Sequence, residues 1–234
     1  HLFAVLEILI AFFSVLGLWL LAPMDSALFK IIFPYFPDVL VAVVLIFPIT
    51  VCLGILFPTV SRCFTKDKES VGASIGYLYS ANTIGCVLGS LICGFFLIPR
   101  IGSTGTVLVL TGINVLLGLI LFLTDLKRFL RPLFLTVAIG GIACTTLMAA
   151  TLQDPFFQII KQRVQRVLGN DGVIYLHREN VAATITAFGS KTNPLRKHLW
   201  LNGVGMTILL TETKLMAHLP LLLCKDPKEL LIVC

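Results

Sequence analysis

Five apolar stretches dominate this chain and limit what it can fold into. They cover residues 2–22, 39–60, 71–98, 103–124 and 132–151, with ends placed to within a few residues. Each is long enough to cross roughly 30 Å of hydrocarbon as an α-helix that rises about 1.5 Å per residue. A membrane β-barrel would instead alternate polar and apolar residues in segments of about ten. The pattern therefore predicts an α-helical, multi-pass membrane domain.

Charged residues are distributed unevenly along the chain. Residues 1–151 contain 8 Lys/Arg and 6 Asp/Glu, whereas residues 152–234 contain 10 and 6 in little more than half the length. The second part has the composition of a soluble protein. We therefore predict a transmembrane domain over 1–152, an amphipathic linker helix over 153–169 and a water-soluble region over 170–234. The first part excludes a purely soluble enzyme, a disordered protein and a disulfide scaffold.

Glycines punctuate the third apolar stretch, at positions 72, 76, 85, 89 and 94. Gly85 and Gly89 are four residues apart and share one helical face, where small side chains let two helix backbones approach closely. The pattern predicts tight helix packing, and the same stripe would also suit an oligomer contact. The alternative is a substrate pathway along this helix, with Asn82, Thr83 and Asn114 as its few polar groups.

Glu7 is the only ionisable residue well inside a predicted span. Intramembrane charges are functional candidates by default, so a proton- or ion-coupling role competes with a position near the interface. The other spans lack charges, which argues against an ion-driven transporter. The two sides of a five-span model carry six and five Lys/Arg, so the positive-inside rule does not orient the chain.

The helix predicted after the last span has clear end signals. Asp154 suits the N-cap, Pro155 the first helical position, and Gly169 the position just past the end. Its apolar stripe comprises Phe156, Ile159, Ile160, Val164 and Val167. Two interpretations remain open: the helix lies on the bilayer surface with its cations near lipid phosphates, or it packs on the soluble region.

Strand patterns follow from residue 173 onward. Runs at 173–178, 183–188 and 198–201 read as strands, 189–194 as a turn, and Asn202-Gly203 as a type I′ turn. A helix is expected over 212–224, bent at Pro220, followed by a buried strand over 229–234. The sequence thus predicts a small antiparallel β-meander and then the helix and first strand of an α/β domain. Because 229–234 stops within a strand pattern, we expect the chain to be a fragment.

Two segments resemble a known family. The string His218-Leu219-Pro220-Leu221-Leu222-Leu223, followed by Asp226-Pro227-Lys228-Glu229, resembles the spermidine/spermine synthase (polyamine aminopropyltransferase) family. The run from Gly76 through Asn82-Thr83-Ile84-Gly85 to Pro99-Arg100-Ile101-Gly102 is similar to the membrane-embedded branch of that family. In that branch, major-facilitator-like helices precede the synthase domain.

The resemblance implies a Rossmann-like domain and a transfer reaction. An aminopropyl group would pass from decarboxylated S-adenosylmethionine to an amine acceptor, with carboxylates binding the cationic substrate and a base removing a proton. The family's glycine-rich loop and acidic catalytic residue would lie beyond Cys234, so no catalytic residue and no bound cofactor is assigned within the chain. The implied substrate-binding residues are His218, Asn202 and Glu212.

The chain also departs from the family pattern. Met206 stands where soluble members carry Gln, and Glu212-Thr213-Lys214 replaces a Tyr-His-Glu run. A Lys in place of an acid would repel a polyamine. Either the acceptor differs or the activity is lost. Both residues also have a structural interpretation instead of ligand binding. His218 would pack where the helix meets the sheet, and Asn202 would act only as a turn residue.

Other classes of site find little support in the sequence. The seven Cys contain no Cys-x-x-Cys pair, so neither zinc nor a disulfide framework is predicted. The net charge of +6 suits lipid headgroups better than nucleic acid.

We expect a multi-pass protein of the cell (inner) membrane that contacts the bilayer and a small-molecule amine. The alternative is a transporter-like or sensory protein with a non-catalytic nucleotide- or amine-binding domain, or an anchor with a degenerate domain.

Overall fold

The computed structural model describes residues 2–21, 38–65, 71–124, 154–193, 197–209 and 211–223, with isolated helical residues between 139 and 151. The described chain is mostly helical and contains one four-stranded antiparallel sheet. It divides into two compact units, residues 1–159 and 160–234, which are considered separately. More than half of the predicted fifth span and the whole of the predicted strand 229–234 lie outside the described residues.

Three helical stretches are long and apolar enough to cross a membrane: Leu2–Leu21, Val43–Phe64 and Val71–Leu121. They belong to α1 (Leu2–Leu21), α3 (Asp38–Phe64), α4 (Val71–Ile92), the π-helical turn η2 (Cys93–Leu97) and α5 (Ile98–Thr124). The helical multi-pass character predicted from the apolar runs is therefore supported for the first part of the chain. The third stretch combines two of the predicted spans.

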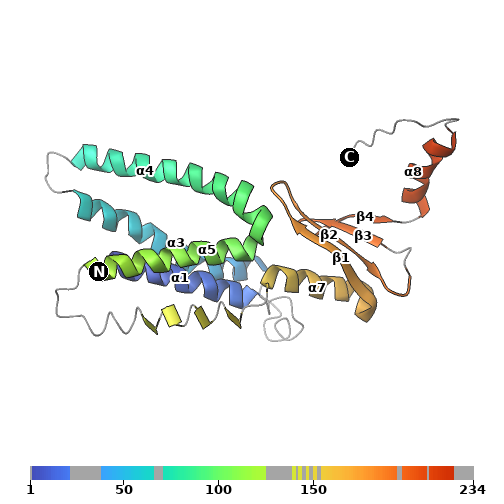
Figure 1. Cartoon of the computed structure of the whole chain (residues 1–234), viewed down its shortest axis with the longest axis horizontal. Coiled ribbons are helices and arrows are strands. Elements are labelled where there is room, and N and C mark those ends of the chain that lie inside the picture. The colour runs from blue at the N-terminus through green and yellow to red at the C-terminus, as the bar shows by residue number, and fades with distance from the viewer. Residues whose placement is uncertain are drawn as a thin grey trace. The chain divides into compact units, whose positions relative to one another are not determined.

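Gly102 separates those two spans. Its backbone has φ 72° and ψ 173°, a conformation that is nearly exclusive to glycine, within an otherwise helical segment. Helical structure continues through Pro99 and Arg100, so the expected four-residue connection contracts to this single residue. The chain turns back here, and α5 runs beside α1 (Figure 1). Arg100 lies over the Phe96 ring at 5.3 Å from its centroid, next to the turn.

The helix packing of the membrane unit centres on α1, which contacts both α3 and α5. Leu6 and Ile10 are buried with Cys52 of α3. The closest backbone approach is at Gly118 of α5, where a Cβ atom would lie 3.0 Å from Cγ1 of Ile8 and 3.2 Å from the Ala4 carbonyl oxygen. Small-residue packing thus occurs between α1 and α5.

The glycine stripe of α4 does not form the tight contact predicted for it. A Cβ atom added at Gly85 or Gly89 would meet nothing within 4 Å, and the same holds at Gly72, Gly76 and Gly94. None of the described side chains of α4 is buried. The prediction was wrong for the described part of the chain. Glycine spacing shows which face of a helix permits a close approach, but it does not identify a second helix that packs there.

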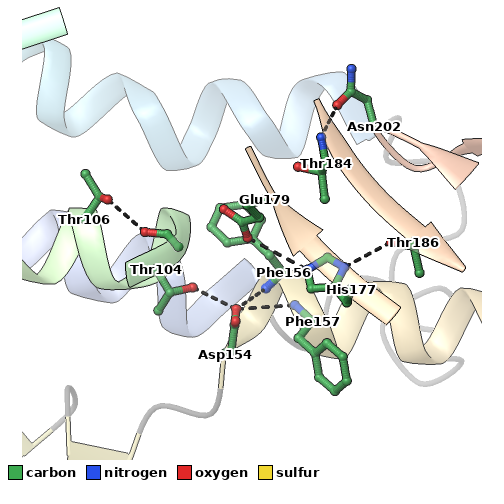
Figure 2. A network of polar contacts seen from close by, with 11 residues as sticks. Thr104, Thr106, Asp154, Phe156, Phe157, His177, Glu179, Thr184, Thr186 and Asn202 are labelled. Atoms are coloured by element: carbon green, nitrogen blue, oxygen red, sulfur yellow. Dashed lines mark hydrogen bonds and ion pairs between the residues drawn. The ribbon is translucent and has the colours of Figure 1, made fainter. Parts of the chain in front are cut away.

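Helix α7 (Pro155–Leu168) begins as its end signals predict. The Asp154 carboxylate accepts hydrogen bonds from the backbone N–H groups of Phe156 and Phe157, at 3.1 and 3.3 Å. These groups have no partner inside the helix, so the cap satisfies two of them. The same oxygen accepts a 2.8 Å hydrogen bond from the Thr104 hydroxyl of α5 (Figure 2). Gly169, with φ 67°, follows the last helical residue and starts the 3-10 turn η3 (Gly169–Asp171).

The sheet is a simple meander. Its strands are β1 (Gly172–Glu179), β2 (Thr184–Ser190), β3 (Lys197–Leu201) and β4 (Val204–Leu209), paired in that order and all antiparallel. The predicted antiparallel meander is confirmed. Gly189 and Ser190, expected to open a turn, extend β2 instead, because Gly189 pairs with Lys197. The turn starts after Ser190, whose hydroxyl oxygen accepts hydrogen bonds from the N–H groups of Thr192 and Asn193.

The core of the second unit lies between α7 and one face of the sheet (Figure 1). Phe188 is fully buried, stacks on His198 at 4.9 Å between ring centroids and meets Trp200 edge-on at 4.6 Å. Ile160 and Val164 of α7 pack against this cluster. Of the two interpretations of the linker helix, packing on the soluble region is therefore the one observed, while Val167 remains 45 % exposed. The final described helix, α8 (Thr211–Leu223), follows β4 and matches the helix expected over 212–224.

Candidate functional site

Asn202 occupies the turn between β3 and β4. Its φ of 50° and the φ of 76° at Gly203 are both positive, as a type I′ turn requires. Its side-chain oxygen accepts a 2.8 Å hydrogen bond from the backbone N–H of Thr184, and its own N–H donates to the Thr184 carbonyl, also at 2.8 Å (Figure 2). The side chain therefore fastens the β3–β4 turn to the start of β2. This geometry favours the turn role for Asn202 over ligand contact.

His218 lies in the middle of α8. Its Nδ1 is 2.9 Å from the carbonyl oxygen of Lys214, one helical turn earlier. A carbonyl can only accept, so Nδ1 carries the hydrogen, and Nε2 of this exposed side chain is left to face a ligand or solvent. No hydrogen bond or ion pair joins His218 to Asn202 within the described chain. The side chain of Glu212 lies outside the described residues, although its backbone forms part of α8.

Two positions at which the chain departs from the family pattern lie close to these residues in sequence. Met206 sits where the pairing of β4 with β3 shifts by one residue, and it is 63 % exposed. Lys214 is half-buried on α8, one turn before His218. A cation is therefore close to the imidazole, on the same side of the helix. This arrangement is less suited to a diamine than an acid would be.

The sheet also contains a polar cluster that the sequence analysis did not identify. Nδ1 of His177 is 3.0 Å from the Thr186 hydroxyl on the neighbouring strand, and Nε2 is 3.9 Å from a carboxylate oxygen of Glu179 (Figure 2). The His177 and Glu179 side chains are only 12 % and 10 % exposed, and Thr186 is fully buried. Because His177 and Glu179 are two apart in a strand, they share one face. This spacing of two residues within a predicted strand was the feature of the sequence that could have indicated the cluster.

This cluster joins β1 to β2 through polar side chains. Thr186 orients the imidazole ring through its contact with Nδ1. Thr186 is too deeply buried to serve as a nucleophile for an external substrate. Glu179 and His177 together form a half-buried acid–imidazole pair on one face of β1.

Glu7 lies on the buried side of α1, which faces α5. The residue is 5 % exposed, and a Cβ atom placed on Gly118 would lie 3.4 Å from its own Cβ. It forms no hydrogen bond or ion pair with another residue of the described chain. The packing of α1 on α5 therefore buries this residue between the two helices.

Metal-ligating side chains do not gather within the described residues: no group of three His, Cys, Asp or Glu is close enough to bind an ion. Four cysteines of the membrane unit are free thiols, at positions 52, 63, 86 and 93. Cys144, Cys224 and Cys234 lie outside the described residues.

Comparison with known proteins identifies no relative of this chain. No protein-family model, curated protein or solved structure matches the chain.

Proposed function

We propose that the chain belongs to a membrane-bound, spermidine-synthase-like protein that acts on an S-adenosyl compound and an amine. Three apolar helices, a four-stranded antiparallel meander and then α8 follow one another in the order that the resemblance requires. The observation that carries the proposal is the meander, which runs directly into α8, the helix that bears His218. A Rossmann-like domain would continue from that helix, and its glycine-rich loop and catalytic acid are expected after Cys234.

The proposed reaction is a displacement at carbon. The lone pair of the acceptor amine attacks the carbon beside the sulfonium of decarboxylated S-adenosylmethionine. The new C–N bond forms as the C–S bond breaks, sulfur keeps the electron pair as a neutral thioether, and the amine loses a proton to a general base. The protein contributes alignment of the two reactants and carboxylates that bind the cations.

Exposed apolar side chains on α8 support a packing role for that helix. Leu215, Leu219 and Leu222 recur at helical spacing and are 49, 51 and 79 % exposed. A stripe of this kind normally lies against a sheet or another helix. In the proposed domain it would cover the α/β sheet, and His218 would approach the ligand through Nε2. We propose the cytoplasmic side of the cell membrane for this domain, because the donor nucleotide is made in the cytoplasm.

Calorimetry with the full-length protein in detergent tests the proposal. We expect heat of binding with decarboxylated S-adenosylmethionine or S-adenosylmethionine, and formation of the aminopropylated product when a diamine is added. His218→Ala should weaken binding, whereas Met216→Ala, at another exposed position on the same helix, should not. Absence of heat with both nucleotides would contradict the proposal.

The second candidate is a transporter-like or sensory membrane protein whose soluble domain binds a nucleotide-like or amine ligand without catalysis. Lys214 beside His218 favours it, because a cation at this position opposes a polyamine. Nucleotide binding without product formation, for every amine offered, would select this alternative.

A further inference from the structure

Helix α7 carries three cations and no acidic residue over its 14 positions. Lys161, Arg163 and Arg166 are all exposed and together make up the cationic face of α7. Arg166 lies in the last turn, where a positive charge also stabilises the end of the helix. That structural role does not extend to Lys161, which lies in the middle of the helix. The charge of this face suits an anionic partner.

The start of α7 is attached to the end of a membrane span. The Thr104 hydroxyl donates a 2.8 Å hydrogen bond to the Asp154 carboxylate, which caps α7 (Figure 2). Thr104 is two residues past Gly102, where the predicted spans 71–98 and 103–124 meet. A turn between two spans lies at a surface of the bilayer, because irregular backbone exposed to lipid is excluded from the hydrocarbon. The first turn of α7 therefore lies at a face of the bilayer.

The cations of α7 are within reach of that face. At about 1.5 Å of rise per residue, Lys161 is about 10 Å and Arg166 about 18 Å along the helix from Asp154. The attraction of an anionic surface for a cation falls off over about 8–10 Å at moderate salt. Lys161 is close to that range whichever way the helix leaves the surface, and Arg163 and Arg166 come within it when α7 lies along the surface. Arg100, exposed and two residues before Gly102, adds a cation at the same boundary.

The apolar side of α7 is not available for insertion into the bilayer. Ile160 and Val164 pack with Phe188 in the core of the second unit. Amphipathic helices normally bind membranes by burying their apolar face among the lipids, and in α7 that face is already covered by the sheet. Contact between α7 and lipid would therefore depend on charge and be sensitive to salt.

We propose that the cationic face of α7 binds the headgroups of acidic phospholipids in the bilayer that the membrane unit spans. Guanidinium and ammonium groups donate charge-assisted hydrogen bonds to phosphate oxygens. A zwitterionic headgroup carries its own cation, so an acidic lipid is the better partner for a face without carboxylates. A membrane is favoured over a soluble polyanion because the Thr104–Asp154 contact holds the start of α7 at the bilayer face. The proposal does not depend on the synthase-like activity.

Native mass spectrometry of the full chain in detergent tests the proposal. The protein is titrated separately with phosphatidylglycerol and with phosphatidylcholine of the same acyl chains, and the bound lipid is counted. We expect phosphatidylglycerol to bind about tenfold to a hundredfold more tightly, which is the range for two or three cations near an acidic surface. The preference should shrink as the ammonium acetate concentration rises.

Charge variants locate the contact. Combined substitution of the cationic face, Lys161→Gln with Arg163→Gln and Arg166→Gln, should remove most of the preference, with up to about fivefold for each cation. The matched control removes three exposed cations of the sheet, Arg178→Gln with Lys191→Gln and Lys197→Gln, and should keep the preference. Arg163→Lys with Arg166→Lys preserves the charge and should keep it as well. Far-ultraviolet circular dichroism checks that each variant is folded.

Other outcomes would overturn the proposal. Equal affinity for the two lipids, or an equal loss in the two triple variants, means that α7 does not recognise acidic lipid. Binding of sn-glycerol 3-phosphate as tightly as phosphatidylglycerol would assign the face to a small phosphate, and tighter binding of single-stranded RNA would assign it to a soluble polyanion. If the triple variant of α7 fails to fold, an unchanged preference in Lys161→Gln alone still contradicts the proposal.

Discussion

The side-chain oxygen of Asn202 lies 2.8 Å from the backbone nitrogen of Thr184 and accepts its hydrogen bond. A residue from the β3–β4 turn thereby secures the first residue of β2, eighteen positions earlier. The bond connects the β3–β4 turn to β2, and substitutions of Asn202 can test its contribution to stability.

Substitutions of Asn202 should separate the turn from the hydrogen bond. Asn202→Ala loses the bond and places a Cβ at positive φ, so we expect a loss of about 1–2 kcal/mol in unfolding free energy. Asn202→Gly keeps the turn and should lose less, and Asn202→Asp keeps an acceptor. Fluorescence of Trp200 during denaturation, in a Trp19→Phe background, measures these differences. Equal effects of all three substitutions would contradict the assignment.

Phe188 should be the most sensitive core position of the second unit. It is fully buried between His198 and Trp200. Phe188→Ala should cost about 3–5 kcal/mol, because it removes the ring and leaves a cavity. Val204→Ala, at a position 65 % exposed, is the control and should change stability little. Chemical denaturation of the full chain in detergent measures both, and a small effect at position 188 would argue against this core.

Asp154 should stabilise the start of α7 through its carboxylate. Asp154→Ala removes the cap on Phe156 and Phe157 and should cost about 0.5–2 kcal/mol. Hydrogen exchange at these two amides should accelerate. Thr104→Val removes only the contact from α5 and should leave the exchange of these amides nearly unchanged. Equal acceleration in both variants would mean that the Thr104 contact maintains the cap.

Gly102 and Gly112 should respond in opposite directions to alanine. At φ 72° and ψ 173°, a side chain at position 102 is strained, and Gly102→Ala should destabilise the membrane unit by about 1–3 kcal/mol. Gly112 lies within α5 with nothing near its Cβ position, so Gly112→Ala should stabilise by up to about 1 kcal/mol. Thermal unfolding in one detergent compares them. Destabilisation of similar size by both would contradict the turn at Gly102.

Gly118 should tolerate a larger side chain less well than Gly85. Valine at position 118 would press on Ile8 and the Ala4 carbonyl, and we expect a loss of about 1–3 kcal/mol. Gly85→Val places the same side chain on the same kind of helix but in open surroundings. Thermal unfolding distinguishes the two. A greater loss at Gly85 would indicate that α4 packs through its glycine stripe after all.

Local patterns in the sequence determined much of this structure. Apolar length predicted membrane helices, the Asp154-Pro155 pair located the start of α7, and Asn202-Gly203 located a hairpin turn. These features depend on residues within a few positions of one another, so they can be read from the chain directly.

Contacts between distant residues were decided only by the tertiary structure. Glycine spacing pointed to Gly85 and Gly89, whereas the close approach occurs at Gly118, because the identity of the opposing helix depends on how the chain turns at Gly102. The pairing of His177 with Thr186 likewise depends on strand register. A cavity lined by Leu18 of α1, Ile49 of α3 and Leu110 of α5 likewise needs three helices at once. Sequence pattern specifies which face of an element is able to pack, and the three-dimensional arrangement alone specifies what it meets.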